Sequence, residues 1–467
     1  MQNAKLQTEF SFLETRGKKR TKFSSPFKIQ NLKRKYPKFI YQNYFYKISG
    51  ENLEIFFDFK IEPDFSFKPK ITIKNVGLLR IDLNKLKNLV FHLGLIEMIS
   101  YWKATCSPTI EIKAGYLNKK QIRWWQDLIM KGMGQFFFEN KIPFQKPKFL
   151  IGRASTESDG EEENKVLFAF PKSAKGILVP VGGGKDSAVT LELLSDFSKK
   201  KAEIRCFSLN PTDAAKKMMK LAGCKKPVVA ERKIDKLLLE LNRKGFLNGH
   251  TPFSAYLAFL TTLVASLFGQ KYIALSNEKS SNEGNVKYLG RTINHQWSKS
   301  FEFEEKFRKY SEKYLTEAVE YFSFLRPLYE IQIAEIFSRY PKYFPVFLSC
   351  NEAYKTASGT KKPAKKWCGK CSKCLFVFMV LYPFLKKKEI LKIFGKNLFQ
   401  DKKLLPLLQQ LIGERGFKPF ECVGTKKESL SALYLCWKKN KTVEESPQPI
   451  LLRYFEKKVL SKYKRKK

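Results

Sequence analysis

The stretch VPVGGGKDSAVTLELL, from Val179 to Leu194, carries the most informative pattern of the sequence. It places three glycines, Gly182 to Gly184, between a short apolar run and a helical pattern, with Lys185, Asp186 and Ser187 directly behind them. Because glycine lacks a Cβ atom, its backbone N–H groups can surround an anion closely, and the amino end of the next helix adds positive potential. The stretch therefore predicts an anion-binding loop at the end of a strand.

Strand-like and helix-like segments alternate around this loop. In chain order they are GILVPV (176–181), a helix from about Asp186 to Lys199, EIRCFSL (203–209), a helix near Asp213 to Leu221, PVVAERKI (227–234), the apolar helix PFSAYLAFLTTLVASLF (252–268) and YIALSNE (272–278). Short apolar strands between helices are typical of a parallel sheet covered on both faces. The sequence thus predicts an α/β protein with a doubly wound parallel sheet.

The remainder of the 467 residues is long enough for further domains. Alternating segments such as NLEIFFDFKI, followed by helix-like stretches, predict an N-terminal α+β domain over residues 1–153. The polar, acidic residues 154–165 are interpreted as a linker. The doubly wound domain then covers 166–349, and a C-terminal helical region rich in cysteine, aromatic residues and lysine covers 350–467.

The formal charge of +44, from 88 Lys and Arg against 44 Asp and Glu, is unusual. Such a field attracts phosphates, nucleic acid or an anionic membrane surface. The lysines are, however, scattered along the whole chain among many Phe, Ile and Asn residues, as in a genome biased towards A and T. The charge alone therefore leaves open whether it is functional or compositional.

Two features bear on location. No residue between Lys244 and Lys271 carries a fixed charge, but hydroxyl side chains such as Ser254 and Thr261 interrupt this apolar run, so it predicts a buried helix and no membrane span. Nine cysteines, an odd number in a large chain whose start has no apolar signal segment, are typical of a reducing cytosol and not of a disulfide framework. We expect a cytoplasmic protein.

The loop GGGKDS (182–187) is neither a Walker loop nor a dinucleotide-binding fingerprint, since its glycine spacing fits neither. It resembles the PP-loop of ATP pyrophosphatases, usually S-G-G-x-D-S, with Gly182 in place of the first serine. The resemblance implies an adenine nucleotide alpha-hydrolase-like fold and cleavage of ATP to AMP and diphosphate. It further implies that Asp186 orients the nucleotide or helps to hold Mg²⁺, and that Lys185 and Ser187 contact phosphate, although the missing hydroxyl puts one side-chain contact in doubt.

A series of further motifs narrows the family. They are NGHTPFSA (248–255), LSNEKSSNEG (275–284), NHQWSKSFEFE (294–304), LRPL (325–328), SCN (349–351), WCGKCSKCLFVF (367–378), IFGKNL (393–398) and KPFECVG (418–424). In this order they resemble the UDP-N-acetylmuramoyl-L-alanyl-L-glutamate epimerase family, MurL, over about residues 170–430. The resemblance implies inversion of the terminal L-glutamate of UDP-MurNAc-L-Ala-L-Glu, with ATP and Mg²⁺ consumed through adenylylation of its carboxylate. It also implies a role in peptidoglycan synthesis, with no nucleic-acid partner. Recognition of the UDP-sugar is one role open to the N-terminal domain, whose purpose the sequence does not reveal.

Two histidines are candidates for the groups that transfer protons. His295 and His250 lie within motifs, and histidine titrates near neutral pH, as an acid–base catalyst should. His295 follows a strand in a loop, whereas His250 precedes the apolar helix and would serve equally well as its cap. Asn277 and Glu278, at the end of a strand, would hold Mg²⁺ or the ribose, or merely form a turn.

A cysteine cluster adds a metal candidate. Cys368, Cys371 and Cys374 follow the spacing C-x₂-C-x₂-C, and Cys350 upstream supplies a fourth thiolate, enough for a tetrahedral zinc site. An iron–sulfur cluster and reduced cysteines in a packed turn are the alternatives. Cys350 and Cys422 would also suit a pair of proton-carrying thiols, but Cys350 cannot serve both purposes.

Two other functions stay open at this point. A PP-loop enzyme that modifies tRNA or forms a deazapurine would also suit the positive charge, the aromatic residues and a zinc knuckle. A nucleic-acid-binding protein with a degenerate nucleotide fold would explain the replacement of serine by Gly182. Formation of AMP and of D-glutamate separates all three functions.

Overall fold

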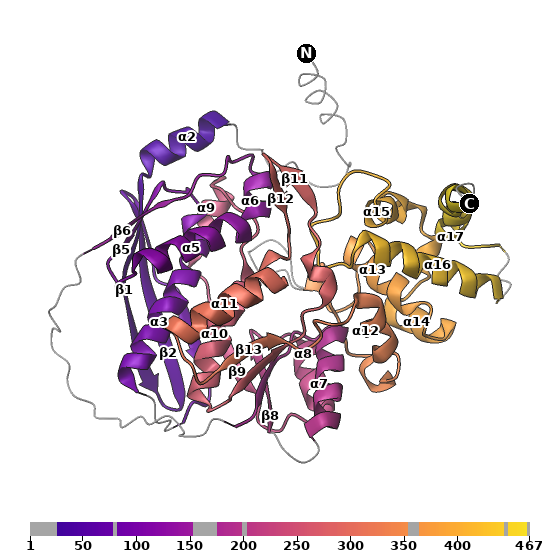
Figure 1. The fold of residues 1–467 in the computed structure, drawn as a ribbon, viewed down its shortest axis with the longest axis horizontal. Coiled ribbons are helices and arrows are strands. Elements are labelled where there is room, and N and C mark those ends of the chain that lie inside the picture. The colour runs from indigo at the N-terminus through magenta and orange to yellow at the C-terminus, as the bar shows by residue number, and fades with distance from the viewer. Residues whose placement is uncertain are drawn as a thin grey trace.

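An 11-stranded mixed sheet runs through the protein. The structure, a computed structural model, describes residues 26–77, 82–152, 175–198, 203–353, 364–442 and 447–464, so the predicted linker over 154–165 lies outside the described residues. Strand order is β13-β10-β7-β8-β9-β4-β2-β1-β5-β6, with β3 paired to β2. Figure 1 shows the N-terminal strands at one end of the molecule and the C-terminal helices at the other. The chain is thus a mixed α/β protein, as predicted.

The N-terminal region contributes an antiparallel meander and helices. Its elements are α2 (Pro26–Lys35), β1 (Lys38–Ser49), β2 (Asn52–Glu62), β3 (Phe65–Phe67), β4 (Lys70–Ile73), α3 (Leu83–Glu97), α4 (Ile99–Trp102), β5 (Thr109–Ile112), α5 (Lys119–Gly132), α6 (Gly134–Glu139) and β6 (Lys148–Ile151). Strand β2 buries every second side chain, from Leu53 to Ile61, because successive residues of a strand point to opposite faces. The predicted strands and helices of this region are present.

The central region holds five parallel strands. Its elements are β7 (Ile177–Pro180), α7 (Lys185–Ser198), β8 (Ile204–Leu209), α8 (Asp213–Leu221), β9 (Val228–Lys233), α9 (Lys236–Arg243), α10 (Phe253–Leu267), β10 (Tyr272–Leu275), β11 (Val286–Tyr288), β12 (Arg291–Ile293), α11 (Phe301–Tyr314), β13 (Glu320–Ser323) and α12 (Glu330–Phe337). The chain proceeds from β7 through β8 to β9, then crosses back to β10 and β13 on the other side of β7. Strand β7 therefore marks the point where the strand order reverses.

Antiparallel pairing of β4 with β9, for example Ile73 opposite Ala230, joins the two regions into one sheet. The hydrogen-bonded sheet therefore continues across the predicted domain boundary. The division of the chain into domains stays a prediction.

Both faces of the central strands are covered. Leu178 of β7 packs in one core together with α10, while its neighbour Val179 packs in a second core with α12 and the C-terminal helices. Helix α10, the apolar run of the sequence, is almost entirely buried. Among the described residues, no helix is both long and apolar enough to span a membrane.

After residue 350 the described chain is helical, as predicted. Its helices are α13 (Ser372–Leu381), α14 (Lys387–Phe394), α15 (Leu405–Leu411), α16 (Lys426–Thr442), α17 (Ile450–Tyr454) and α18 (Ser461–Lys464). Helix α13 is buried on all sides, since every residue from Ser372 to Leu381 is inaccessible to solvent. It anchors the C-terminal helices to the second core.

One cysteine pair departs from the expectation of reduced thiols. Cys206 in β8 and Cys224 after α8 form a disulfide, with Cα atoms 6.1 Å apart. The strand, helix and turn between them return the chain to the same place. A separation of 18 residues in sequence gives no sign of this proximity.

Candidate active site

The glycine loop lies between β7 and α7, at the reversal of strand order. Gly183 has φ +90°, and a Cβ atom there would lie 2.8 Å from the backbone nitrogen of Ala215, so only glycine fits. The N–H of Gly182 donates to Oγ of Ser187 at 3.3 Å. In open α/β sheets, ligands bind beyond the carboxyl ends of the strands at such a reversal.

Beneath the loop lies a buried ion cluster. The Lys185 ammonium, 1% exposed, pairs with the carboxylates of Asp186 and Glu330. Burial lowers the pKa of Lys185, but attraction to these two carboxylates outweighs it and the pKa is raised. Burial likewise opposes ionisation of Glu330, yet Lys185 and Lys373 bring its pKa down to about 2. Lys185 and Glu330 therefore form a charged pair at neutral pH, next to the glycine loop.

Glu278 follows β10 and is the least settled charge of the site. It is 4% exposed, and burial, reinforced by the nearby Glu330 and opposed by Lys299, raises its pKa to about 7. Its neighbour Asn277 donates from Nδ2 to Oγ of Ser323 at 3.0 Å, which ties the end of β10 to β13. Because the pKa of Glu278 lies near 7, a cation bound beside this carboxylate would stabilise its ionised form.

The two predicted histidines lie together. The ring centroids of His250 and His295 are 4.7 Å apart, with an angle of 50° between the rings. His250 does not cap α10, because that helix begins at Phe253 with Pro252 as its cap residue. Its pKa is well below the ordinary value, first because of burial and second because of His295.

Hydrogen bonds determine which nitrogen of His295 carries the proton. Its Nδ1 lies 2.5 Å from Oε1 of Gln135, and Nε2 of Gln135 donates to Glu139 at 2.9 Å. With the amide group of Gln135 oriented in this way, Nδ1 of His295 carries the proton and Nε2 keeps its lone pair. Burial, and then Lys299, lower the pKa of His295 to about 4, so the ring is neutral at pH 7.

Lys299 and Cys422 connect the loop to the histidines. The Lys299 Nζ donates to Sγ of Cys422 at 3.2 Å, and the same sulfur lies 4.0 Å from Nε2 of His295. Burial lowers the pKa of Lys299, but attraction to Cys422 and Glu278 outweighs it and the pKa is raised. One half-buried ammonium group thus acts electrostatically on Glu278, Cys422 and His295.

Two further lysines reach the site from the C-terminal region. The Lys373 ammonium donates to the carbonyl oxygen of Cys422 and lies 3.7 Å from Oε1 of Glu330. The Lys418 Nζ, in a side chain 1% exposed, lies 3.4 Å from Oε1 of Glu283. The C-terminal helices therefore form part of the site and not a separate unit.

The four predicted metal ligands come together. The sulfur atoms of Cys350, Cys368, Cys371 and Cys374 all lie within 4.8 Å of one another. Backbone N–H groups of Lys370 and Cys374 donate to two of these sulfurs at 3.4 Å, and Gly369 takes φ +63° in the turn. Four sulfurs at this spacing, in a turn with N–H···S bonds, fit a tetrahedral zinc ion.

Several residues of the site escape a reading of the sequence. Lys299 and Lys373 lie inside the quoted motifs and Gln135 lies outside them, but nothing in the local pattern of any of the three distinguishes it from a surface residue. Glu330 lies just beyond LRPL, at the start of α12. Lys299, for example, lies between Ser298 and Ser300, so its neighbours in sequence do not predict burial.

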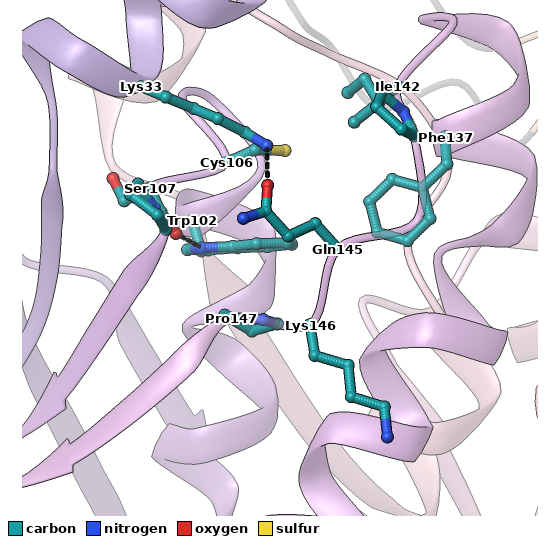
Figure 2. A pocket seen from close by; sticks show the side chains of 11 residues that line it. Lys33, Trp102, Cys106, Ser107, Phe137, Ile142, Gln145, Lys146 and Pro147 are labelled. Atoms are coloured by element: carbon teal, nitrogen blue, oxygen red, sulfur yellow. Dashed lines mark hydrogen bonds between the residues drawn. The ribbon is translucent and has the colours of Figure 1, made fainter.

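Several cavities open among the described N-terminal and central residues. Figure 2 shows one of about 10 Å³, where the hydrogen bond from Lys33 to Gln145 crosses beside Trp102. A second, of about 360 Å³, lies between α5–α6 and β12, next to Asn294. The first has room for about one water molecule, whereas the second is large enough for a ligand.

Comparison with known proteins assigns the family. Residues 30–324 match the MurL N-terminal domain, and residues 346–464 match the MurL C-terminal domain. Three relatives are named UDP-N-acetyl-alpha-D-muramoyl-L-alanyl-L-glutamate epimerase. That of Salinispora tropica is 34% identical over 343 residues, 73% of this chain and 72% of the relative. Those of a Micromonospora species and of Xanthomonas oryzae pv. oryzae are 34% and 31% identical, covering 73% and 75% of this chain and 73% and 76% of the relatives. The chain therefore belongs to the MurL family.

Proposed function

We propose that the protein is an isomerase that epimerises the terminal L-glutamate of UDP-MurNAc-L-Ala-L-Glu to D-glutamate, consuming ATP and releasing AMP and diphosphate. The names of the three relatives support the substrate. The observation that carries the mechanism is the series of buried and half-buried groups from the glycine loop through Glu278, Lys299 and Cys422 to His295. The product would enter peptidoglycan synthesis in the cytoplasm, and thus cell-wall formation, cell shape and division.

The central region would have the PP-loop variant of the doubly wound fold. Support comes from the order β13-β10-β7-β8-β9, in which all neighbours are parallel, and from the loop after β7. Backbone N–H groups of residues 182–184 and the amino end of α7 would receive the phosphates of ATP. Lys185 would stabilise this arrangement from below, since its ammonium is already paired with Asp186 and Glu330.

Adenylylation removes the obstacle to proton abstraction. An oxygen of the substrate carboxylate attacks the α-phosphorus of ATP, the bond to the β-phosphate oxygen breaks, and diphosphate leaves. The resulting mixed anhydride no longer carries the carboxylate charge, so loss of the neighbouring Cα proton does not create a second negative charge beside the first. After reprotonation on the other face, water cleaves the anhydride to give the free acid and AMP.

Asp186 and Glu278 would hold Mg²⁺. Hard oxygen ligands suit this ion, and the raised pKa of Glu278 shows a carboxylate in need of a positive neighbour. When bound, Mg²⁺ would neutralise phosphate charge. Lys299 and Lys373 lie near Glu278 and would add positive potential where the diphosphate departs.

His295 would accept the Cα proton. Its Nε2 carries the lone pair, and Gln135 fixes the orientation of the ring. His250, beside it, would shield the ring from water and assist the transfer. The four cysteines would hold a structural zinc ion that places Lys373 in the site, since Lys373 lies between Cys371 and Cys374 in the chain.

One assay tests the proposal. The purified protein is incubated with ATP, Mg²⁺ and UDP-MurNAc-L-Ala-L-Glu, and both glutamate chirality and AMP are measured. We expect D-glutamate and AMP to appear together. Neither product should form when ATP or UDP-MurNAc-L-Ala-L-Glu is left out. AMP formation that depends on tRNA, without D-glutamate, would indicate a tRNA-modifying PP-loop enzyme instead, and no AMP with any substrate would indicate a binding protein.

A further inference from the structure

The cavity of about 360 Å³ has the position of a second binding site next to the histidines. Gly134 and Asn294 line it, and the residues that follow each of them, Gln135 and His295, form the hydrogen bond that orients the imidazole. A ligand in this cavity would therefore lie against the N-terminal side of the reaction centre. No residue of the glycine loop lines this cavity, so this space is not required for ATP.

The charges in the cavity favour an anion. Lys131 and Arg291 line it together with one carboxylate, Glu302. That carboxylate is already committed, because Lys131, Lys306 and the indole N–H of Trp297 all contact it. Burial opposes its ionisation, but the bonds from these groups bring the pKa of Glu302 down to about 2.

Arg291 is the group best placed to bind the anion. Its guanidinium lies 4.8 Å from the centroid of the Phe144 ring, and within the described ranges no carboxylate forms an ion pair with it. Stacking of this kind holds the planar group in position without using its N–H donors. A guanidinium held by an aromatic ring, with its donors available, is suited to bidentate binding of phosphate oxygens.

The remaining walls are aromatic and apolar. Phe144 and Trp297 line the cavity, and Trp297 is fixed by its bond to Glu302 at 3.0 Å. Flat rings beside a phosphate-binding group are suited to a nucleobase, which stacks on them. A volume of about 360 Å³ falls within the range of small-molecule sites.

We propose that this cavity binds the nucleoside diphosphate end of the nucleotide-sugar substrate, with Arg291 on the diphosphate and the aromatic wall beside the base. The inference rests on the proposed function, because it is the substrate of the relatives that carries a UDP group. Bound in this way, the substrate would enter from the N-terminal side, with its peptide end towards His295 and the phosphate loop.

The test uses UDP alone as the probe, with the full chain, and calorimetry as the measurement. Arg291→Ala should weaken UDP binding by about ten- to a hundredfold, because one charge-assisted pair is lost. Arg243→Ala, which removes an exposed arginine at the end of α9, is the matched control and should leave UDP affinity unchanged. Equal UDP affinity in wild type and Arg291→Ala, or no binding of UDP to the wild type, would overturn the proposal.

Kinetics separate failure of this inference from failure of the proposed function. In Arg291→Ala, KM for UDP-MurNAc-L-Ala-L-Glu should rise while kcat stays the same, since the lost contact is made equally in ground and transition states. The nucleotide-free fragment MurNAc-L-Ala-L-Glu should be converted equally by both proteins. A wild type that turns over neither substrate contradicts the proposed function, whereas normal turnover with an unchanged KM in Arg291→Ala contradicts only the cavity.

Discussion

Nζ of Lys299 lies 3.2 Å from Sγ of Cys422, although 123 residues separate them in sequence. The sulfur also lies 4.0 Å from Nε2 of His295. Burial lowers the pKa of Lys299, but attraction to Cys422 and Glu278 outweighs burial and raises it. The pair therefore joins the end of the site that holds Glu278 to the end that holds His295. We therefore expect a change at Cys422 to impair the proposed proton transfer at His295, while the proposed adenylylation at the glycine loop continues.

Replacement of Cys422 tests this connection. Cys422→Ala leaves the half-buried Lys299 without its sulfur acceptor, so we expect the free energy of unfolding to fall by about 1 kcal/mol and epimerisation to slow, while AMP formation continues. Cys422→Ser, which keeps an acceptor, is the matched control and should retain most of the activity. Urea unfolding and D-glutamate analysis provide the measurements. Unchanged epimerisation in Cys422→Ala would exclude Cys422 from this role.

Asp186→Ala tests whether the glycine loop takes part in the proposed cleavage of ATP. The buried Lys185 keeps Glu330 as its partner, so the fold should survive, but loss of the Asp186 carboxylate should reduce AMP formation by about a hundredfold or more. Asp196→Ala, at an exposed position of the same helix, serves as the control. Retained AMP formation in a folded Asp186→Ala protein would remove the loop from the mechanism.

Glu278 should leave a signature in the pH dependence of stability. Its pKa is about 7 in the folded protein and about 4.5 when exposed, so between these values the folded state holds a proton that the unfolded state has lost. Stability from this group is present below pH 4.5 and is lost as pH rises to about 7. The glutamine of Glu278→Gln does not ionise, so its stability lacks this pH dependence. Between pH 4.5 and about 7 the free energy of unfolding of the variant should therefore rise relative to that of the wild type, by at most about 3 kcal/mol.

Thermal unfolding of both proteins at several pH values, without nucleotide or Mg²⁺, measures this difference. Glu312→Gln, at an exposed position of α11, is the control and should follow the wild type throughout. A constant difference between Glu278→Gln and wild type from pH 4.5 to 8 would show that Glu278 ionises normally. If Glu278 also holds Mg²⁺, AMP formation by the variant should fall.

The cysteine cluster should carry one metal ion per chain. Cys371→Ser removes one of four sulfurs, so we expect the metal content to fall and the midpoint of thermal unfolding to decrease, because the metal would ligate both Cys350 and the start of α13. Elemental analysis identifies the metal, and visible absorption distinguishes an iron–sulfur cluster from zinc. Cys436→Ser, at a cysteine outside the cluster, should leave the metal content unchanged. Wild-type protein free of metal yet fully active would contradict the prediction.

Local patterns predicted the elements of the central region well. The strands at GILVPV, EIRCFSL, PVVAERKI and YIALSNE and the helices between them are all present, because period-two and period-3.6 patterns depend on neighbours in sequence. The pairing of β4 with β9 could not be predicted in this way. Its register depends on residues about 160 positions apart, and no local pattern records which edges meet.

The site was predictable to a similar extent. Motifs located the loop, both histidines and the four cysteines, and the structure brings each of these sets together. The contacts between sets were not predictable, since Gln135 meets His295 across 160 residues and Lys185 meets Glu330 across 145. Such pairs are fixed by the packing of helices on the sheet and leave no trace in spacing.

His295→Gln separates adenylylation from proton transfer. Glutamine preserves a polar side chain but has no lone pair of comparable basicity, so the variant should still exchange labelled diphosphate into ATP in the presence of substrate. It should fail to replace the Cα hydrogen with deuterium from deuterium oxide. His92→Gln is the control, because His92 is hydrogen-bonded to Tyr310 and Asn88 in the N-terminal core and should exchange deuterium as the wild type does. Because burial lowers the pKa of His295 to about 4, wild-type exchange should also persist down to about pH 5, where an ordinary histidine would already be protonated. Undiminished deuterium incorporation in His295→Gln would exclude this residue as the base and leave His250, whose ring lies 4.7 Å away, as the next candidate.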